Sequence, residues 1–507
     1  MTGVYVVANA SEAKFDSVAQ KLDQFTVYAK KAQKDWQVPG MSIAIVENGK
    51  IVYQKGFGAR NVQGDPVTPD TIFDIASLTK SFTATLLALQ IDQGKYTWDT
   101  PVQTLYSPFK LYNQKTTRKF AVRDLMAHDS GLPEDALDDL YNFGYSSKAI
   151  MHAVRFVKPV APFRKEFAYQ DVFSEFAKTI IEKASDKNYT ATLHQNLLTP
   201  LHMEKTYTRV EPVLNTLANT AQPFQYYLTK NYPYPKDSPY LTKMWALKPG
   251  LAGGGIHSTA VDLAKWLIFN MHQDLVENQQ IVSKKNIDFI HTPQTIISTA
   301  KGKIGQAYGE GWYIDKEAYK PYTVLYHAGG GTGTHSFIAY IPEKKLGIVI
   351  LTNQWGNKVP EVLYQRLFDL SLKHSPLVDW NTIYLEKYRN ISTKNNISLS
   401  EPCKKMPSRE FLNGYTGIYY NQIYGNLKIS VTKDNKLILS IGPQHIIWYL
   451  TYCQKNIFTA YWPNPNHMSI PMLDEGQNHV EFTAGKMKIP YLGNDNVFIK
   501  KAESVND

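Results

Sequence analysis

Apolar positions recur with two different periodicities along this chain, and the change from one to the other divides the chain into two parts. From residue 11 to residue 374, stretches with apolar side chains at every third or fourth position alternate with short apolar runs. From residue 411 onward, short alternating segments are separated by turn residues. A period near 3.6 indicates helices, and a period of two indicates half-buried strands. We therefore expect an α/β part followed by an all-β part.

Strand-like runs lie at both ends of the first part, on either side of a long helical region. Asn48-Gly49 joins the first two runs and is a strong hairpin signal. Neither end has enough strands to bury its apolar face alone, so we expect the strands of both ends to pair in one sheet. The predicted elements are helices at 11–36 and 353–374, strands at 41–46, 51–56, 322–327, 336–341 and 346–352, and a mainly helical region at 96–310.

The second part begins after a polar stretch. Residues 375–410 contain three prolines and a Ser/Thr/Lys/Asn run, which indicates a linker. The predicted domains are therefore 11–374 and 411–503, joined by this linker. The strand spacing predicts a small all-β barrel or sandwich. Its expected strands are 415–420, 427–431, 436–441, 446–451, 480–483, 486–489 and 497–500.

Candidate chemistry begins at Ser77-Leu78-Thr79-Lys80, which opens an apolar helix after a strand-like run. Positions three apart share a helix face, so Lys80 lies one turn from Ser77. A lysine that loses solvation is easier to deprotonate and can then take the serine proton. This is the Ser-Lys form of a hydroxyl nucleophile. On pattern alone, however, Ser77 as a plain helix N-cap is the favoured interpretation.

The same spacing also occurs at other serines, among them Ser11, Ser298 and Ser430, and the surroundings of these three argue against chemistry. Ser430-Val431-Thr432-Lys433 even repeats the Ser-x-Thr-Lys form. It lies in an alternating stretch, where residues three apart point to opposite faces of a strand. Ser11 lies near the start of the chain with no apolar periodicity behind it, and Ser298 lies in a polar, Thr-rich stretch. Ser77 alone combines the spacing with a preceding strand-like run and a following apolar helix.

Two further stretches carry functional groups. His327 is followed closely by Gly329 and Gly330, between two strand-like runs. Glycines let the backbone approach a substrate, and their N–H groups can complete an oxyanion hole with that of Ser77. A flexible glycine-rich hairpin is the alternative. Tyr169 precedes a predicted helix and can point into a cleft, although a tyrosine in the core is the commoner outcome.

Composition excludes several classes of protein. The net charge of +10 is diffuse, without a basic block or a nucleic-acid motif, so we expect no nucleic-acid partner. No apolar run approaches the ~18 residues of a membrane span, so we expect no transmembrane segment. Neither H-E-x-x-H nor G-x-S-x-G occurs, which disfavours a metallohydrolase and a conventional α/β-hydrolase.

The two cysteines and the first residues bear on the compartment. Cys403 and Cys453 can form one bridge in an oxidising compartment or remain thiols in a cytosol, and they leave no cysteine-based zinc site. Val7-Ala8-Asn9-Ala10 is similar to the end of a signal peptide, although a basic segment before it is missing. Export to a periplasm or the outside is therefore one hypothesis, and a cytoplasmic protein with a frayed start is the other.

Taken together, the motifs resemble the serine β-lactamase and penicillin-binding-protein superfamily, in its class C-like, D-aminopeptidase and esterase branch. The resemblance covers roughly residues 15–370 and implies an antiparallel sheet flanked by helices, with a large helical insert. The C-terminal part resembles a lipocalin-like barrel. The matching stretches, in the order of the family, are Val38-Pro39-Gly40-Met41, Asp70-Thr71-Ile72-Phe73, Ser77-Leu78-Thr79-Lys80, Leu125-Met126-Ala127-His128-Asp129-Ser130-Gly131-Leu132-Pro133, the Tyr169 segment, Gly253-Gly254-Gly255-Ile256-His257-Ser258-Thr259, Gly309-Glu310-Gly311-Trp312 and His327-Ala328-Gly329.

The resemblance also implies a role for each residue. It implies a serine hydrolase that forms an acyl-enzyme on amide or ester bonds, in D-amino-acid peptides, esters or β-lactam-like compounds, without a metal or other cofactor. The implied partner is a small-molecule or peptide substrate. The implied roles are Ser77 as nucleophile, Lys80 as its base, Tyr169 as general acid/base, His327 in place of the lysine of the third motif, and Gly329 and Gly330 against the substrate, with Gly330 offering the second oxyanion N–H.

One position departs from the family pattern. The second motif is commonly Tyr-x-Asn, and here Asp171 takes the place of the Asn. An ionised Asp cannot donate to a substrate carbonyl, and it favours the protonated form of a neighbouring lysine. It can instead hold a substrate ammonium group. The alternative hypothesis is a catalytically impaired penicillin-binding-like protein that serves as a ligand-binding module.

Overall fold

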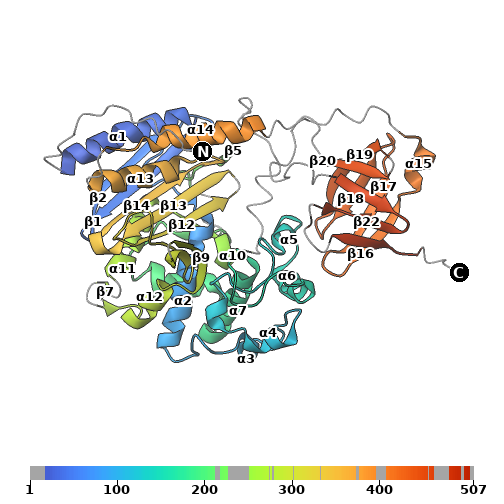
Figure 1. Ribbon diagram of the computed structural model, residues 1–507, viewed down its shortest axis with the longest axis horizontal. Helices are drawn as coiled ribbons and strands as arrows, with labels where there is room; N and C mark the ends of the chain where they lie inside the picture. Colours follow the sequence, from blue (N-terminus) through green and yellow to red (C-terminus); the bar gives the residue numbers. More distant parts are fainter. Residues whose placement is uncertain are drawn as a thin grey trace.

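The computed structural model contains a mixed α/β part and a C-terminal barrel (Figure 1). No helix in the described part of the chain is long and apolar enough to cross a membrane. The structure describes residues 18–211, 217–225, 250–272, 275–276, 279–300, 302–331, 333–372, 376–394, 407–454, 456–461, 479–490, 492 and 496–502.

An eight-stranded antiparallel sheet forms the centre of the first part, as the resemblance predicted. Strands from the two ends of the domain pair directly, with Ile43 opposite Ile350, so the predicted single sheet is confirmed. In sheet order, the strands are β2 (Lys50–Gly58), β1 (Gly40–Glu47), β14 (Leu346–Thr352), β13 (Thr334–Ile341), β12 (Val324–Gly331), β11 (Tyr313–Asp315), β10 (Lys303–Tyr308) and β9 (Thr295–Ala300).

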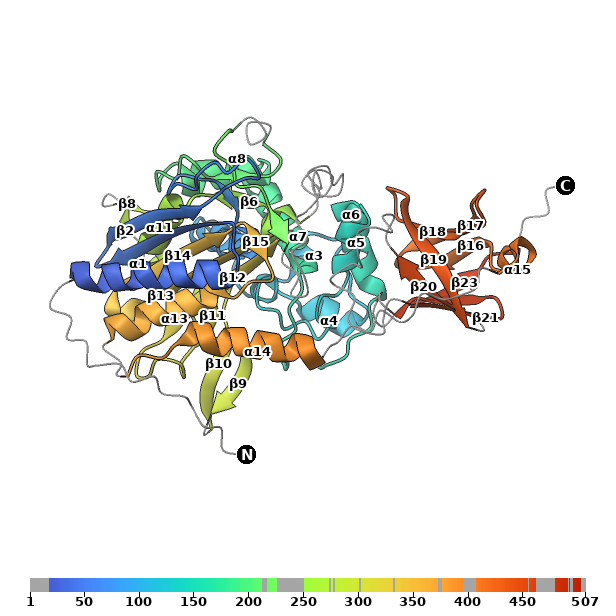
Figure 2. The same cartoon turned by 90° about the horizontal axis from the view of Figure 1, so that it is seen from above.

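Helices cover both faces of this sheet (Figures 1 and 2). One face packs against α1 (Val18–Asp35) and α13 (Val359–Ser371), through buried residues such as Phe25 and Leu363. The other face packs against α2 (Thr79–Asp92) and α11 (Ala260–His272), where Phe82 stacks on Trp266. Helix α2, which follows Ser77, therefore lies wholly inside the domain.

The edge strand β9 and its neighbour β10 differ from the prediction, which placed them in the mainly helical region 96–310. Ile296 and most of its neighbours in β9 are polar or exposed, so the apolar alternation that marks a half-buried strand is weak. Pairing with β10, which no local pattern reveals, holds this segment in the sheet. Edge strands with polar side chains are common, because one side of such a strand faces solvent.

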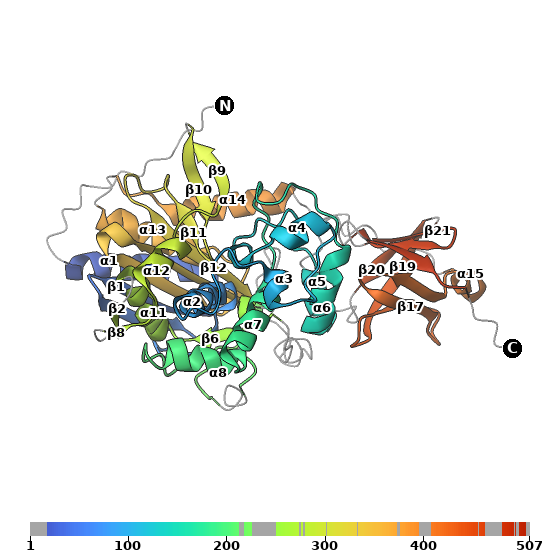
Figure 3. The ribbon, with the colours of Figure 1, turned by 90° about the horizontal axis from the view of Figure 1, so that it is seen from below.

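The helical insert lies between the sheet and the barrel (Figure 3). Aromatic side chains hold it together, including Phe109, Phe120, Phe173 and Phe176. Its helices are α3 (Val102–Leu105), α4 (Gln114–Lys119), α5 (Asp138–Asn142), α6 (Ser147–Ala153), α7 (Val172–Ser185) and α8 (Tyr189–Leu193), and α10 (Leu251–Gly254) and α12 (Lys284–Ile290) follow after a gap in the description.

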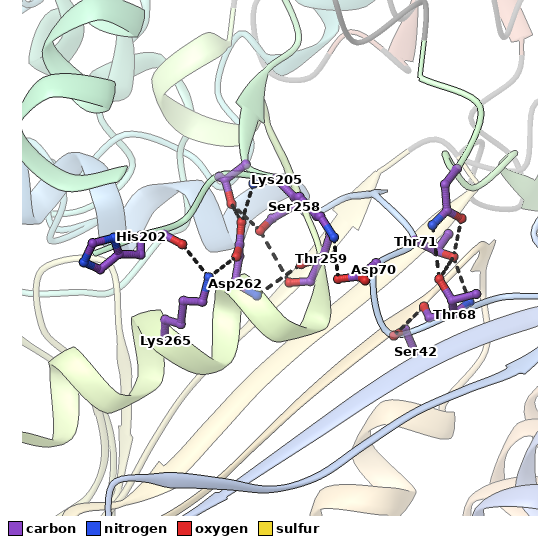
Figure 4. Close-up of polar contacts among 12 residues, drawn as sticks. Ser42, Thr68, Asp70, Thr71, His202, Lys205, Ser258, Thr259, Asp262 and Lys265 are labelled. Atoms are coloured by element: carbon purple, nitrogen blue, oxygen red, sulfur yellow. Dashed lines mark hydrogen bonds and ion pairs between the residues drawn. The ribbon is translucent and has the colours of Figure 1, made fainter. Parts of the chain in front are cut away.

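A polar network fixes the start of α11 (Figure 4). Thr259 Oγ1 accepts from the N–H of Asp262 at 3.1 Å and so caps the start of the helix. The Asp262 carboxylate accepts from the N–H of Lys205 at 2.7 Å and from the hydroxyl of Thr206 at 3.1 Å. The network therefore ties the segment after α8 to β6 (Ile256–Ser258), and the N–H of Ile256 in turn donates to Thr79 Oγ1 beside the Ser77 turn.

The predicted linker needs a correction in its first half. Helix α14 (Trp380–Lys394) occupies that part of residues 375–410 and packs on the first domain. Trp36 directly follows α1, and its Nε1 donates to Asn381 Oδ1 at 3.0 Å. The rings of Trp36 and Tyr388 lie 5.2 Å apart. Residues distant in sequence therefore stabilise this helix, which its polar composition did not predict. Where the domains begin and end stays a prediction, and residues 395–406 lie outside the described part.

The C-terminal strands close into an eight-stranded barrel. The prediction missed one of them, β20, which pairs with β19 directly before it in the chain. Tyr424 in the first barrel turn donates to Asp139 Oδ2 of α5 at 2.6 Å, which joins the barrel to the helical insert. Cys453 is disulfide-bonded, and Cys403 lies outside the described residues. The strands are β16 (Gly417–Asn421), β17 (Gly425–Val431), β18 (Leu437–Ile441), β19 (Ile446–Gln454), β20 (Ile457–Tyr461), β21 (His479–Thr483), β22 (Lys486–Lys488) and β23 (Val497–Lys500).

Candidate active site

Ser77 lies in a 3₁₀ turn, η1 (Ala76–Leu78), that runs directly into α2. Ala76 has a φ of +45°, a conformation that L residues rarely adopt. Two contacts hold the turn: the N–H of Ala76 donates to Asp74 Oδ1 at 2.8 Å, and Ser336 Oγ of β13 donates to the carbonyl of Ile75 at 2.7 Å. Tertiary contacts thus hold Ser77, partly exposed, on a strained turn.

Lys80 is fully buried one helical turn beyond Ser77. Its Nζ donates to Ser77 Oγ at 3.0 Å and to the carbonyl of Gly253 at 2.9 Å, and it forms an ion pair with Asp171 Oδ1 at 2.5 Å. The hydrogen bonds to Ser77 and Gly253 use two of the three protons of an ammonium group, and the Asp171 carboxylate pairs with its charge. If one proton is lost, a donor remains for Gly253, and the lone pair can face the Ser77 hydroxyl.

Tyr169 completes this group from the segment before α7. Its ring lies 4.7 Å from Lys80 Nζ, in a cation–π contact. Burial, followed by the charge of Asp171, raises the pKa of Tyr169 well above its ordinary value, although the Ser77 side chain opposes the shift. Tyr169 is therefore a neutral phenol near pH 7, which suits the donation of a proton.

The His128–Pro133 motif holds the segment that carries Tyr169. The carbonyl of His128 accepts from the N–H of Ala168 at 3.0 Å. Ser130 Oγ donates to Gln170 Oε1 at 2.8 Å, and Gln170 Nε2 donates to the carbonyl of Leu132 at 2.8 Å. The motif therefore positions Tyr169 and Asp171 on either side of a buried Gln170, whose role no sequence signal indicated.

Asp171 differs from Lys80 in being accessible, because 32% of its side chain is exposed. The structure brings Asp171 to Lys80, as the motif assignment required. Burial and the charges of Asp171 and Asp135 raise the pKa of the neighbouring Asp138 carboxyl well above its ordinary value. Carboxyl groups therefore gather on the side of the site formed by Asp171 and the start of α5, and the raised pKa of Asp138 favours its neutral form.

His327 lies in β12, buried among three tyrosines. Its Nδ1 lies 2.6 Å from the carbonyl of Ala328, which can only accept, so Nδ1 carries the proton and Nε2 accepts from the hydroxyl of Tyr308 at 2.8 Å. Burial, with the charge of Lys80, lowers the pKa of His327 to about 3. His327 is thus neutral, and its ring lies 6.3 Å from that of Tyr169.

No local sequence pattern indicates a role for Tyr308 or Tyr313, which enclose His327. The Tyr313 ring lies 5.3 Å from the ring of His327. The two tyrosines come from β10 and β11, on opposite sides of the Gly309-Glu310-Gly311-Trp312 stretch. That stretch is one of the matching motifs. The position of the two tyrosines directly beside it is the signal in the sequence that could have identified them.

Glycines let β12 approach the nucleophile turn closely. A Cβ on Gly329 would lie 2.3 Å from the carbonyl oxygen of Ile75, and one on Gly330 would meet the ring of Trp355 at 2.3 Å. The lack of a side chain at Gly329 therefore lets β12 pack against the residue that precedes Ala76, and the predicted approach of a substrate to Gly329 stays a prediction. The oxyanion role of the Gly330 N–H stays a prediction.

Within the described ranges, no group of three or more His, Cys, Asp or Glu side chains is placed to hold a metal ion. The chemistry that this arrangement offers comes from a serine hydroxyl, an amine, a phenol and backbone N–H groups. Together these can form and hydrolyse an acyl ester.

Comparison with known proteins agrees with this geometry. The Beta-lactamase family matches residues 26–370. Curated relatives include an "Unguisins hydrolase ungD'" of Aspergillus campestris, 28% identical over 84% of this chain and 81% of the relative. Another is "Protein flp" of Staphylococcus aureus, 26% identical over 64% of this chain and 62% of the relative. Among solved structures, the octameric penicillin-binding protein homologue from Pyrococcus abyssi shares the fold, with a TM-score of 0.61, 23% identity, and coverage of 94% of this chain and 100% of that one.

Proposed function

This chain belongs to the β-lactamase family and is a hydrolase of the serine type, and we propose that it cleaves amide or ester bonds through an acyl-enzyme on Ser77. The observation that carries the proposal is the contact of Lys80 Nζ with Ser77 Oγ at 3.0 Å, in a buried site. A hydroxyl nucleophile needs a base within hydrogen-bond reach, and Lys80 has the required geometry.

In the proposed acylation, the Ser77 proton moves to the neutral amine of Lys80 while Oγ forms a bond to the substrate carbonyl carbon. The N–H groups of Ser77 and Gly330 receive the developing negative charge. Collapse of the intermediate breaks the bond to the leaving nitrogen or oxygen, which takes the proton of the Tyr169 phenol. Lys80 then returns its extra proton to Tyr169, and a water molecule, deprotonated by the same groups, releases the acyl product.

We further propose that the substrate carries a free ammonium group close to the scissile bond. Asp171 is accessible, and it lies beside further carboxyl groups at the start of α5. A substrate cation that pairs with Asp171 competes with Lys80 for the carboxylate, which favours the neutral amine that acylation requires. D-Amino-acid amides, peptides or esters with a free amino group fit this requirement better than neutral β-lactam-like carbonyls.

The ion pair of Asp171 with Lys80 also supports a second candidate. A lysine that remains protonated cannot take the Ser77 proton, so the protein can bind ligands of this class without turnover. Slow or absent acylation with retained ligand binding would favour this ligand-binding module over the enzyme.

The test is intact-mass analysis after incubation with a fluorophosphonate, a penicillin and a D-amino-acid ester. We expect at least one acyl or phosphonyl adduct, mapped to Ser77 and absent from Ser77→Ala. Ser430→Ala is the matched control, because that serine also begins a Ser-x-Thr-Lys sequence. An adduct on another serine, or one that persists in Ser77→Ala, contradicts the proposal.

We also propose that the protein works in a periplasm or outside the cell. The disulfide at Cys453 supports an oxidising compartment. Edman sequencing of the mature protein from its native source tests this, since export with processing would remove the first residues.

A further inference from the structure

Four large apolar side chains are exposed on one wall of the barrel. They are Ile418 and Tyr420 on β16 and Val497 and Ile499 on β23, with exposed fractions between 42% and 61%. Strands β16 and β23 are neighbours, and Tyr420 lies directly opposite Ile499. The four side chains therefore form one continuous apolar strip, which we call the β16/β23 strip.

The barrel does not need this strip for its own core. Along both strands the alternate positions point inward, where Tyr419 and Phe498 are buried. Outward positions of a barrel in water are ordinarily polar, and contiguous exposed apolar groups mark a binding surface. The contact with α5 uses other barrel residues, Tyr424 and Trp448.

Exposed lysines border the strip on both sides. Lys428 on β17 pairs with Ile418, while Lys486 and Lys488 on β22 pair with Ile499 and Val497.

A fourth lysine lies at one end of the strip. Lys501 is exposed, and its Nζ lies 5.0 Å from the Tyr420 ring. None of the outward positions of these four strands is acidic in the described residues. Glu481 lies one strand further, beside Lys488, and is hydrogen-bonded to His479. The surface is thus apolar at its centre and positive at its rim.

We propose that the β16/β23 strip and its lysines bind an anionic lipid surface, with the apolar side chains in the headgroup region and the lysines against lipid phosphates. An aromatic and aliphatic centre with a basic border is the arrangement that suits the interface of an anionic bilayer. The net charge of +10 acts in the same direction at longer range.

Two other occupants fit less well. A symmetric contact with a second copy would place the lysine borders of both copies together, with mutual repulsion. An acidic protein would satisfy the lysines. However, a barrel wall is convex, and the large side chains on this one project outward, as insertion into a soft interface requires.

The test is co-sedimentation of the full-length protein with phosphatidylcholine vesicles that contain or lack phosphatidylglycerol. We expect binding to the anionic vesicles that weakens with salt. Ile418→Ser/Tyr420→Ser/Ile499→Ser should abolish it. Lys486→Gln/Lys488→Gln should weaken it by about thirty-fold, since each lysine near an anionic surface contributes about a factor of five.

Matched controls come from α1, where Val27 and the pair Lys30 and Lys34 are exposed. Val27→Ser and Lys30→Gln/Lys34→Gln should bind as the wild type does, and hydrolysis of a soluble ester should be unchanged in every variant. Absence of vesicle binding, equal loss in strip and control variants, or preferential binding to neutral vesicles overturns the proposal. Self-association in sedimentation velocity that the triple variant abolishes would assign the strip to a second copy and would also overturn it.

Discussion

The same tetrapeptide form occurs at Ser77–Lys80 and at Ser430–Lys433, and the two regions differ in what surrounds them. At Ser77 a strained turn enters a buried helix, and Lys80 Nζ lies 3.0 Å from the serine oxygen. Ser430 lies in β17, opposite Ile438, and Lys433 is exposed in the turn beyond that strand. Serine and lysine at this spacing are therefore chemically useful only on a helix that other elements enclose.

The largest expected effect separates these two serines. Ser77→Ala should lower kcat/KM for a reactive ester by a factor on the order of 10⁴ or more, because the nucleophile is lost. Ser430→Ala should leave kcat/KM unchanged. Steady-state kinetics on both purified variants provides the measurement, and equal effects would remove the distinction between the regions.

The next effect concerns the phenol beside Lys80. Tyr169→Phe keeps the ring against His128 but removes the proton donor, so kcat should fall by about 10²–10⁴-fold. An amide substrate should suffer more than an ester with a good leaving group, because the leaving nitrogen needs the proton. Tyr313→Phe is the control for a tyrosine in the same cluster. An equal fall for both substrates would argue against a proton transfer by Tyr169.

Asp171→Asn tests what the carboxylate does to Lys80. Its loss removes the ion pair that holds the Lys80 amine, so acylation by a neutral ester near pH 7 should rise by about tenfold or more. A substrate with a free ammonium group should instead lose kcat/KM. Rate profiles against pH for both substrates measure these changes, and two unchanged profiles would place Asp171 outside the mechanism.

The smallest effect is on stability. Because burial and Lys80 lower the pKa of His327 to about 3, the unfolded chain takes up this proton first as the pH falls below about 6.5. His327 should therefore lower the free energy of unfolding by about 2 kcal/mol at pH 5 relative to pH 8. Chemical denaturation should show a shallower pH dependence in His327→Gln than in His445→Gln, whose histidine is exposed on the barrel.

The contrast between helix α14 and the barrel strands shows where local pattern was sufficient. Most barrel strands alternate cleanly, because one side of each faces a core and the other faces solvent, and their positions were predicted closely. The polar composition of helix α14 predicts part of a linker, because the residue that stabilises the helix, Trp36, lies far away in sequence. Strand β9 was missed for the same reason, because its pairing with β10 rather than its own pattern defines it.

The sequence by itself determined the single sheet with a helical insert, the change to a barrel, and the motif set that contains Ser77, Lys80 and Tyr169. Each depends on periodicity or on residues adjacent in the chain. The tertiary structure alone decided that Lys80 contacts Asp171 and Gly253, that Ser130 and the Leu132 carbonyl hold Gln170, and that Tyr308 and the Ala328 carbonyl fix His327 as a neutral ring. Those contacts join segments far apart in the chain, and no local pattern records which distant atoms share a buried site.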